Sequence, residues 1–243
     1  AQEMHRRWFE SHLDKFNLNY KNRSDEFHGL SIAGPNSRKV LEKIVRDDVS
    51  NEKFKFRDSR RMFVGGVPAI INRISFTGEL GYEIYVAPHY QLKLYEELME
   101  AGKEFNIKPF GGRALMSMRL EKNWGAWTLD YRPDFTAKET GLDAFINWDK
   151  EFIGKESAQK ENSSNKLVPL IVETNEIDVT NNEAVLNGDQ SIGYVTSGGF
   201  AHFVNKSVAF TFIDQKNINS ENKIQVEING DLFNCSIIKE PLY

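Results

Sequence analysis

The residues best placed to do chemistry are two side chains of one predicted strand, Glu83 and Tyr85. They follow an acidic turn bracketed by two glycines, Gly78-Glu79-Leu80-Gly81. Successive side chains of a strand point to opposite faces, so Glu83 and Tyr85 share one face and the apolar residues Tyr82, Ile84 and Val86 share the other. A carboxylate beside an aromatic ring suits a planar heterocycle with adjacent N–H donors, such as a pterin, because it can accept from both donors. The pattern fits equally well an exposed glutamate on the wet face of a half-buried sheet.

A predicted helix over residues 113–122 carries the second group of candidates. Its apolar residues occupy nearly the whole circumference, which predicts a buried helix: Ala114, Leu115, Met116, Met118 and Leu120. Buried charges need partners, so Arg119 is expected to pair with a structural carboxylate. The alternative is that one of the cations of this helix faces an anionic substrate. Just downstream, Trp127 with Trp124 and Tyr131 would either wall a flat ligand or belong to the core.

Composition and missing motifs exclude several classes of function. The chain has 243 residues, a formal net charge of -4 and a single cysteine, Cys235. The acidic balance argues against nucleic acid as a partner, and no apolar run is long enough to span a membrane. One cysteine allows neither a disulfide framework nor a cysteine-rich metal site, and it favours a reducing, cytoplasmic compartment. The five histidines show no metal-ligand spacing, and no dinucleotide fingerprint, P-loop or nucleophile elbow occurs.

Strands and helices alternate in the first half of the chain, which predicts an α+β layer. An amphipathic helix opens the chain and needs a surface to cover, with its apolar residues Met4, Trp8, Phe9, Leu13 and Phe16 at helical spacing. A strand is then predicted over 27–32, followed by a helix whose apolar face consists of Val40, Leu41, Ile44 and Val45. A hairpin of 62–64 and 67–76 turns at Gly65-Gly66, and the strand over 82–86 follows it. The last element of this half is a helix over 89–105, with Leu92, Tyr95, Leu98 and Met99 predicted to face inward.

The second half changes character. A connection over 123–148 is rich in Trp, Tyr, Asp and Pro, and a polar linker covers 161–165. Beyond it, strands are expected over 167–172, 191–196 and 208–213, with a turn at 195–200 and a hairpin at Asn229-Gly230. Regular spacing of short strands indicates a small barrel or sandwich. We therefore predict two domains, 1–160 and 166–243.

Many short motifs, in one order, resemble those of the aminomethyltransferase family, which includes the glycine-cleavage T-protein. The similarity is greatest to the folate-binding C-terminal region of dimethylglycine and sarcosine dehydrogenases. The motifs extend over nearly the whole chain and include Gly29-Leu30-Ser31-Ile32-Ala33-Gly34-Pro35, Val64-Gly65-Gly66-Val67-Pro68, Phe76-Thr77-Gly78-Glu79, Arg119-Leu120-Glu121-Lys122, Phe152-Ile153-Gly154-Lys155 and Val195-Thr196-Ser197-Gly198-Gly199. No single motif is specific, but together they make a strong signal.

The resemblance implies a folate-binding α+β body, incomplete at its N-terminus, followed by a small C-terminal β-barrel. It implies transfer of a one-carbon unit from an amine to tetrahydrofolate, the cofactor, giving 5,10-methylenetetrahydrofolate. Glu83 matches the strand glutamate that holds the pterin ring, and Tyr85 matches a ring-contacting aromatic of some relatives. Glu79 is the second acidic residue of the motif, and as a candidate for pterin binding it ranks below Glu83 and Tyr85.

Two positions differ from the family pattern. Leu115 stands where T-proteins carry a folate-contacting arginine, so Arg113 is the available cation. Ala144 stands near the position of a stacking aromatic, so stacking is expected from Trp127 or Phe145. The resemblance places the catalytic aspartate of the family upstream of the region where this chain begins. No catalytic residue is therefore assigned, and the chain alone is expected to be weakly active or inactive.

As partners, the resemblance implies a small-molecule amine or iminium donor, and either an upstream FAD-dependent dehydrogenase domain or a lipoyl carrier protein. The sequence identifies neither the donor nor the oligomeric state. Two other functions stay open, a non-catalytic folate-binding or assembly module and a sulfonium demethylase-like methyltransferase. An acidic residue at the catalytic position of the family would favour the enzyme.

Overall fold

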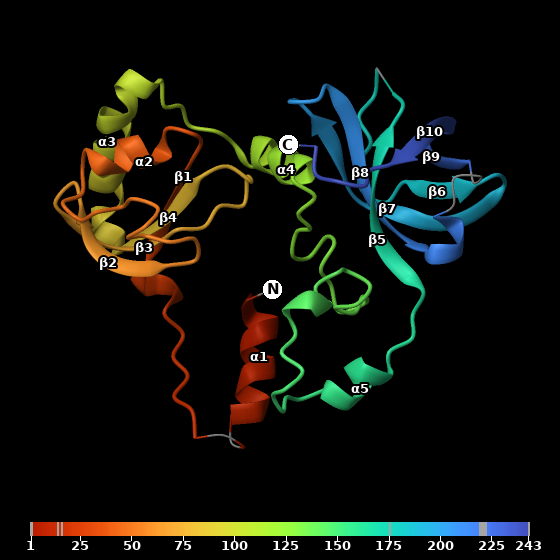
Figure 1. The fold of residues 1–243 in the computed structure, drawn as a ribbon, viewed down its shortest axis with the longest axis horizontal. Helices are drawn as coiled ribbons and strands as arrows, with labels where there is room; N and C mark the ends of the chain where they lie inside the picture. Colours follow the sequence, from red (N-terminus) through yellow and green to blue (C-terminus); the bar gives the residue numbers. More distant parts are fainter. Residues whose placement is uncertain (1, 14, 16, 175, 219–222, 243) are drawn as a thin grey trace. The chain divides into compact units, whose positions relative to one another are not determined.

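The chain forms two compact units, residues 1–110 and 111–243 (Figure 1). The computed structural model describes residues 2–13, 15, 17–174, 176–218 and 223–242. Within this part of the chain, no helix is both long enough and apolar enough to cross a membrane. The division predicted from the sequence, 1–160 and 166–243, stays a prediction.

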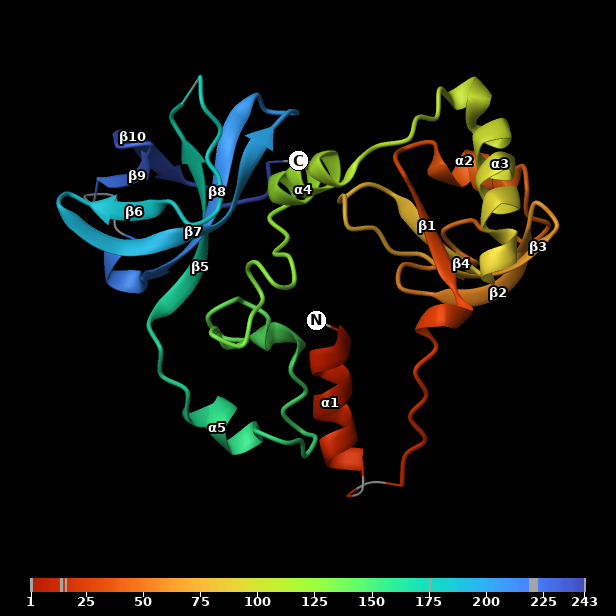
Figure 2. The same cartoon turned by 180° about the vertical axis from the view of Figure 1, so that it is seen from behind.

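The first unit is built on a four-stranded antiparallel sheet. Its strands are β1 (His28–Ala33), β2 (Ser59–Val64), β3 (Val67–Asn72) and β4 (Gly81–Val86), in the order β1-β4-β3-β2. Helices α2 (Ser37–Glu42) and α3 (Gln91–Gly102) pack on the sheet, as Figures 1 and 2 show from opposite sides. Short 3-10 helices precede β1 and flank α3, at η1 (Ser24–Glu26), η2 (Pro88–Tyr90) and η3 (Lys103–Phe105).

The hairpin predicted at two glycines is confirmed, and it joins β2 to β3. Gly65 and Gly66 have φ angles of 56° and 79°, the left-handed values that a tight two-residue hairpin turn requires. A Cβ atom on Gly65 would also lie 2.4 Å from the Glu97 side chain of α3. The turn therefore needs glycine both for its backbone conformation and for the close approach of α3.

The core of the first unit lies between one face of the sheet and the two helices. The strand alternation predicted for β4 is confirmed, since Tyr82, Ile84 and Val86 are buried in this core. The predicted inward face of α3 is partly wrong. Leu98 is buried, but Leu92 and Tyr95 are exposed and Leu94 and Ala101 face the core instead. The face of α3 that packs against the sheet is therefore different from the face that the sequence pattern predicts.

The opening helix is confirmed as α1 (Gln2–Leu13). None of its residues is buried, and Trp8 is 51% exposed. The surface predicted to be covered by this helix is therefore not seen among the described residues of the structure. Phe16, assigned to the same apolar stripe, lies outside the described residues.

The second unit ends in a closed six-stranded barrel. Its strands are β5 (Asn165–Val172), β6 (Ala184–Asn187), β7 (Gln190–Ala201), β8 (Lys206–Asp214), β9 (Ile224–Ile228) and β10 (Asp231–Ile237), in the order β10-β5-β8-β7-β6-β9. The barrel encloses its own apolar cluster, which includes Leu170, Val195, Ala209 and Val226. The predicted α+β body followed by a small barrel is thus confirmed, and the sandwich alternative is excluded.

Two α-helices and two 3-10 helices complete the described part of the second unit. They are α4 (Gly112–Glu121), η4 (Asp143–Phe145), α5 (Lys155–Lys160) and η5 (Gln215–Asn217). The prediction that α4 is buried is wrong for most of its length. Only Arg119, Leu120 and Glu121 of α4 are buried, whereas Ala114 and Met116 are exposed.

The turn predicted over 195–200 is also wrong, because these residues lie inside the long strand β7. A bulge shifts the pairing of β7 with β8 between Val195 and Ser197. Gly198 owes its identity to packing, since a Cβ atom there would lie 2.6 Å from the Val179 carbonyl oxygen. Glycine here permits a close approach of two backbones rather than a reversal of the chain.

Candidate functional site on the open face of the sheet

The face of the first-unit sheet opposite its core carries two rows of side chains in register across the strands. The first row consists of Ser31 on β1, Glu83 on β4, Asn72 on β3 and Ser59 on β2. The second row lies beside it and consists of Gly29, Tyr85, Ile70 and Arg61 on the same four strands. We call the first the polar row. The polar row joins one carboxylate, that of Glu83, to uncharged hydrogen-bonding groups.

Glu83 and Tyr85 lie on the same face, as the sequence predicts, and they are bonded to each other. The Tyr85 Oη donates a hydrogen bond to Glu83 Oε2 at 2.8 Å. Burial, reinforced by the Glu83 carboxylate, raises the pKa of Tyr85 to about 12. The phenol therefore keeps its proton and continues to donate to Glu83 across the physiological range. Among the described residues no other donor reaches the Glu83 carboxylate, so Oε1 and a second lone pair of Oε2 can accept from an external donor.

Gly29 makes room for the Tyr85 ring. The two residues pair across β1 and β4, and a Cβ atom on Gly29 would lie 3.0 Å from Tyr85 Cε1. A contact that short would push the ring aside by a few tenths of an ångström. Gly29 therefore determines where the phenol lies and, through the hydrogen bond, where the carboxylate of Glu83 points.

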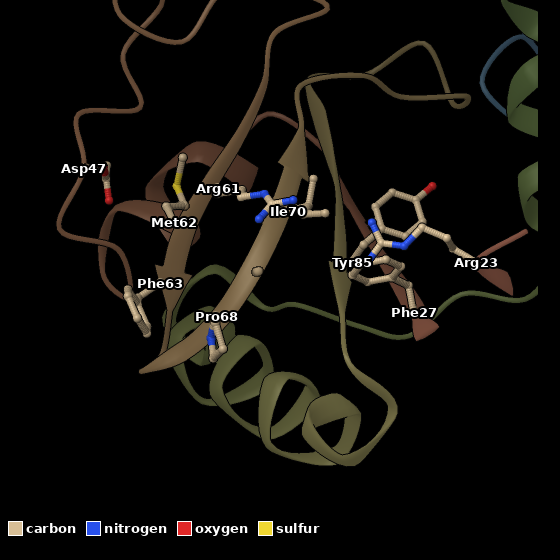
Figure 3. Close-up of a pocket in the computed structure, with 10 residues that line it drawn as sticks. Arg23, Phe27, Asp47, Arg61, Met62, Phe63, Pro68, Ile70 and Tyr85 are labelled. Carbon is tan, nitrogen blue, oxygen red and sulfur yellow. The ribbon is translucent and has the colours of Figure 1, made fainter. Parts of the chain in front are cut away.

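A shallow depression of about 410 Å³ opens beside the polar row (Figure 3). At one end Tyr85 lies with Phe27 and Arg23, whereas Arg61 and Ile70 lie in the middle. Arg23 is neutralised by Glu26, at 2.6 Å, and stacks over Phe27 with its guanidinium carbon 4.7 Å from the ring centroid. The depression thus combines aromatic and apolar side chains with the charged Arg61, and through Tyr85 it adjoins the half-buried carboxylate of Glu83.

The acidic turn before β4 is organised by side-chain hydroxyls. The Ser75 and Thr77 hydroxyl oxygens are 2.8 Å apart, and Thr77 Oγ1 accepts from the backbone N–H of Glu79 at 3.2 Å. Gly78 has a φ of 82°, which glycine adopts without strain. Glu79 therefore lies in the bend that leads into β4, whereas Glu83 lies on the strand itself.

The remaining predicted site residues belong to the second unit. Arg113 lies in the first turn of α4 and is exposed. Trp127 is 68% exposed and meets Tyr131 edge to face, with ring centroids 5.7 Å apart. Of the two interpretations of Trp127, membership of the core is therefore wrong. Glu83, Tyr85 and Glu79 belong to the first unit, and Glu83 and Tyr85 are hydrogen-bonded to each other.

Arg119 pairs with a structural carboxylate, as predicted, and that carboxylate is Asp130. Arg119 Nη1 lies 2.7 Å from Asp130 Oδ2, and both side chains are at most 2% exposed. Asp130 also accepts from the Ser197 hydroxyl at 2.8 Å and from the backbone N–H of Ala126 at 2.8 Å. Burial lowers the pKa of the Arg119 guanidinium, and the charge of Asp130 opposes that shift. Arg119 therefore joins α4 to β7 and is not free to bind a ligand.

Family comparison accounts for both halves of the chain. Residues 1–150 match the GCVT N-terminal domain, and residues 165–243 match the glycine cleavage T-protein C-terminal barrel domain. The chain belongs to the glycine cleavage T-protein family. The closed barrel, β5 to β10, falls within the second matched region of this T-protein family member.

Proteins similar to this T-protein family member include dimethylglycine dehydrogenases and aminomethyltransferases. Mitochondrial dimethylglycine dehydrogenase of Homo sapiens is 35% identical over 97% of this chain, and the chain spans 28% of that protein. An aminomethyltransferase of Thermoanaerobacter pseudethanolicus is 31% identical over 98% of this chain, and the chain spans 65% of that protein. The glycine cleavage system aminomethyltransferase T from Bartonella henselae shares the fold, with a TM-score of 0.66 and 24% identity over 72% of this chain and 50% of that one.

Sequence reasoning missed the residues that surround Glu83 on other strands. Asn72, Ser31 and Gly29 become its neighbours only through strand pairing. The two glycines at Gly65-Gly66 predict that β2 pairs with β3. No local sequence pattern predicts that β3 and β1 both pair with β4. Across the described residues, no group of three or more His, Cys, Asp or Glu side chains is arranged to hold a metal ion.

Proposed function

We propose that this T-protein family member binds tetrahydrofolate and transfers to it a one-carbon unit from an amine, giving 5,10-methylenetetrahydrofolate. The observation that carries the proposal is the Glu83 carboxylate, held by the Tyr85 phenol at 2.8 Å on the open face of a sheet that lies within the family match. A half-buried carboxylate with open lone pairs complements the adjacent ring N–H and amino group of a pterin. The residues present therefore fit the group.

The role of the protein in this proposal is to bind and to orient. Tetrahydrofolate, when bound, supplies the nucleophilic nitrogen that takes up the carbon unit. Glu83 anchors the ring, Tyr85 keeps the carboxylate in one orientation, and the aromatic side chains of Tyr85 and Phe27 support a flat ligand. Holding two reactants in a fixed relation removes much of the entropic barrier of a bimolecular step.

The donor in the proposal is an amine or iminium compound. Similarity to aminomethyltransferases supports a glycine-derived aminomethyl group, delivered by a lipoyl carrier protein. Similarity to dimethylglycine dehydrogenase supports an iminium formed from dimethylglycine or sarcosine by an FAD-dependent dehydrogenase domain. Arg113, Trp127 and Glu79 remain proposed contributors to folate binding.

Calorimetric titration with tetrahydrofolate tests the proposal. Glu83→Gln keeps the size of the side chain but removes the charge and replaces one acceptor by a donor, so the affinity should fall at least about a hundredfold. Glu96→Gln is the matched control, because Glu96 is an exposed carboxylate on α3, the helix that packs on the other face of the sheet. Unchanged affinity in Glu83→Gln, with the control also unchanged, would refute the assignment of Glu83.

A further inference from the structure

Asn72 lies where its side chain could form a hydrogen bond to the same edge of a ligand as Glu83. The two residues pair directly across β3 and β4, both are half-buried, and both belong to the polar row. Directly paired residues on one face of an antiparallel pair have Cβ atoms about 4.5–5.5 Å apart. Within the described residues, the Asn72 side-chain amide has no hydrogen-bond partner in the protein. An amide and a carboxylate therefore lie next to each other, each with open hydrogen-bonding capacity.

The two groups together have a definite donor and acceptor pattern. A carboxylate only accepts, whereas an amide NH₂ group donates. The edge of a 4-oxo pterin presents an exocyclic amino donor, a ring N–H donor and then the C4 carbonyl acceptor, in that order. Glu83 complements the two donors, and the adjacent Asn72 complements the carbonyl. The order of groups on the protein thus matches the order on the ring.

We propose that Asn72 is a specificity-determining residue that donates a hydrogen bond to the C4 carbonyl of the bound pterin. This inference rests on the proposed function. It adds a second residue, on a different strand from Glu83, that forms a hydrogen bond to the pterin ring. Ser31, on the other side of Glu83, is exposed and has the shorter side chain. Asn72 therefore determines the orientation of the ring on the polar row, with the C4 carbonyl toward Asn72 and not toward Ser31.

The carbonyl stretch of tetrahydrofolate labelled with ¹³C at C4 tests the assignment by isotope-edited infrared spectroscopy. A hydrogen bond lowers the frequency of a carbonyl stretch, so Asn72→Ala should raise the frequency of the bound ligand and weaken binding about threefold to tenfold. Asn72→Asp should bind more weakly than Asn72→Ala, because it places a second carboxylate beside Glu83 and opposite the carbonyl. Asn187→Ala, which changes a half-buried strand asparagine of the barrel, is the matched control and should change neither quantity.

The outcomes separate this inference from the function on which it rests. An unshifted carbonyl stretch in Asn72→Ala, with tetrahydrofolate still bound to the unmodified chain, would overturn the role of Asn72 alone. A shift in Ser31→Ala instead would show that the ring lies the other way round and would also overturn it. Failure of the unmodified chain to bind tetrahydrofolate would overturn the proposed function and this inference together.

Discussion

The Tyr85 phenol donates to the Glu83 carboxylate at 2.8 Å, so these two candidate site residues of β4 hold each other in place. They stand two residues apart on a strand and share its open face. Because the strand is paired on both sides, neither backbone position can shift without breaking the sheet. A carboxylate restrained in this way loses little conformational entropy when a ligand binds, which favours affinity and selectivity.

Replacing Tyr85 by Phe should weaken tetrahydrofolate binding about tenfold while leaving the fold intact. The ring remains, but the charge-assisted hydrogen bond that orients Glu83 is lost. Calorimetry measures the affinity, and urea unfolding should show that stability changes by about 1 kcal/mol or less. Equal affinity in Tyr85→Phe would show that the phenol does not position the carboxylate.

Tyr85 should ionise later than an ordinary tyrosine. Burial and the neighbouring carboxylate raise its pKa from 10.0 to about 12. The folded state therefore holds this proton more tightly than the unfolded chain does. The resulting stability is fully present below pH 10 and is lost as the pH rises from 10 to 12.

Carbon-13 NMR of ring-labelled tyrosines checks this order of titration. The Tyr85 signal, assigned by its disappearance in Tyr85→Phe, should keep the neutral phenol shift at pH 11. In Glu83→Gln the same signal should titrate at lower pH, since the carboxylate that resists ionisation is gone. A Tyr85 signal already half-ionised at pH 10 would contradict the prediction.

Gly29→Ala should weaken ligand binding without unfolding the protein. The added Cβ atom would lie 3.0 Å from Tyr85 Cε1 and displace the ring that orients Glu83. Alanine fits the strand backbone at this position, so we expect stability to change by about 1 kcal/mol or less. A double-mutant cycle tests whether Gly29 acts through the Tyr85 ring. If it does, Gly29→Ala should have no further effect on affinity in a Tyr85→Ala background. Additive losses would show that Gly29 acts independently of Tyr85.

Asp130→Ala should destabilise the second unit severely. It leaves the Arg119 guanidinium buried without its counter-charge, and breaking a buried pair in this way costs about 3–5 kcal/mol. Asp134→Ala is the matched control, because Asp134 is 65% exposed and pairs with Arg132 at the surface. Removing that pair should cost about 0–1 kcal/mol. Urea unfolding measures both, and similar effects in the two variants would refute the structural role of Asp130.

Local patterns predicted much of the architecture. The alternation of apolar and polar residues in β4 placed Glu83 and Tyr85 together on one face, and paired glycines located the β2–β3 turn. The same kind of pattern failed at α3, where Leu92 and Leu94 are both apolar but only Leu94 is buried. It failed again at Gly198, which looks like a turn residue and lies inside β7. Both failures occur where a distant segment decides which residue is covered.

The sequence by itself determined the family, the α+β body with its barrel, and the face that carries the candidate site. These follow from the two-residue repeat of strands, from turn residues and from the order of short motifs, all of which are local properties of the chain. The tertiary structure decided that Asn72 faces Glu83, that Gly29 leaves room for Tyr85 and that Asp130 neutralises Arg119. Strand register and the packing of separate segments depend on contacts between residues far apart in the chain.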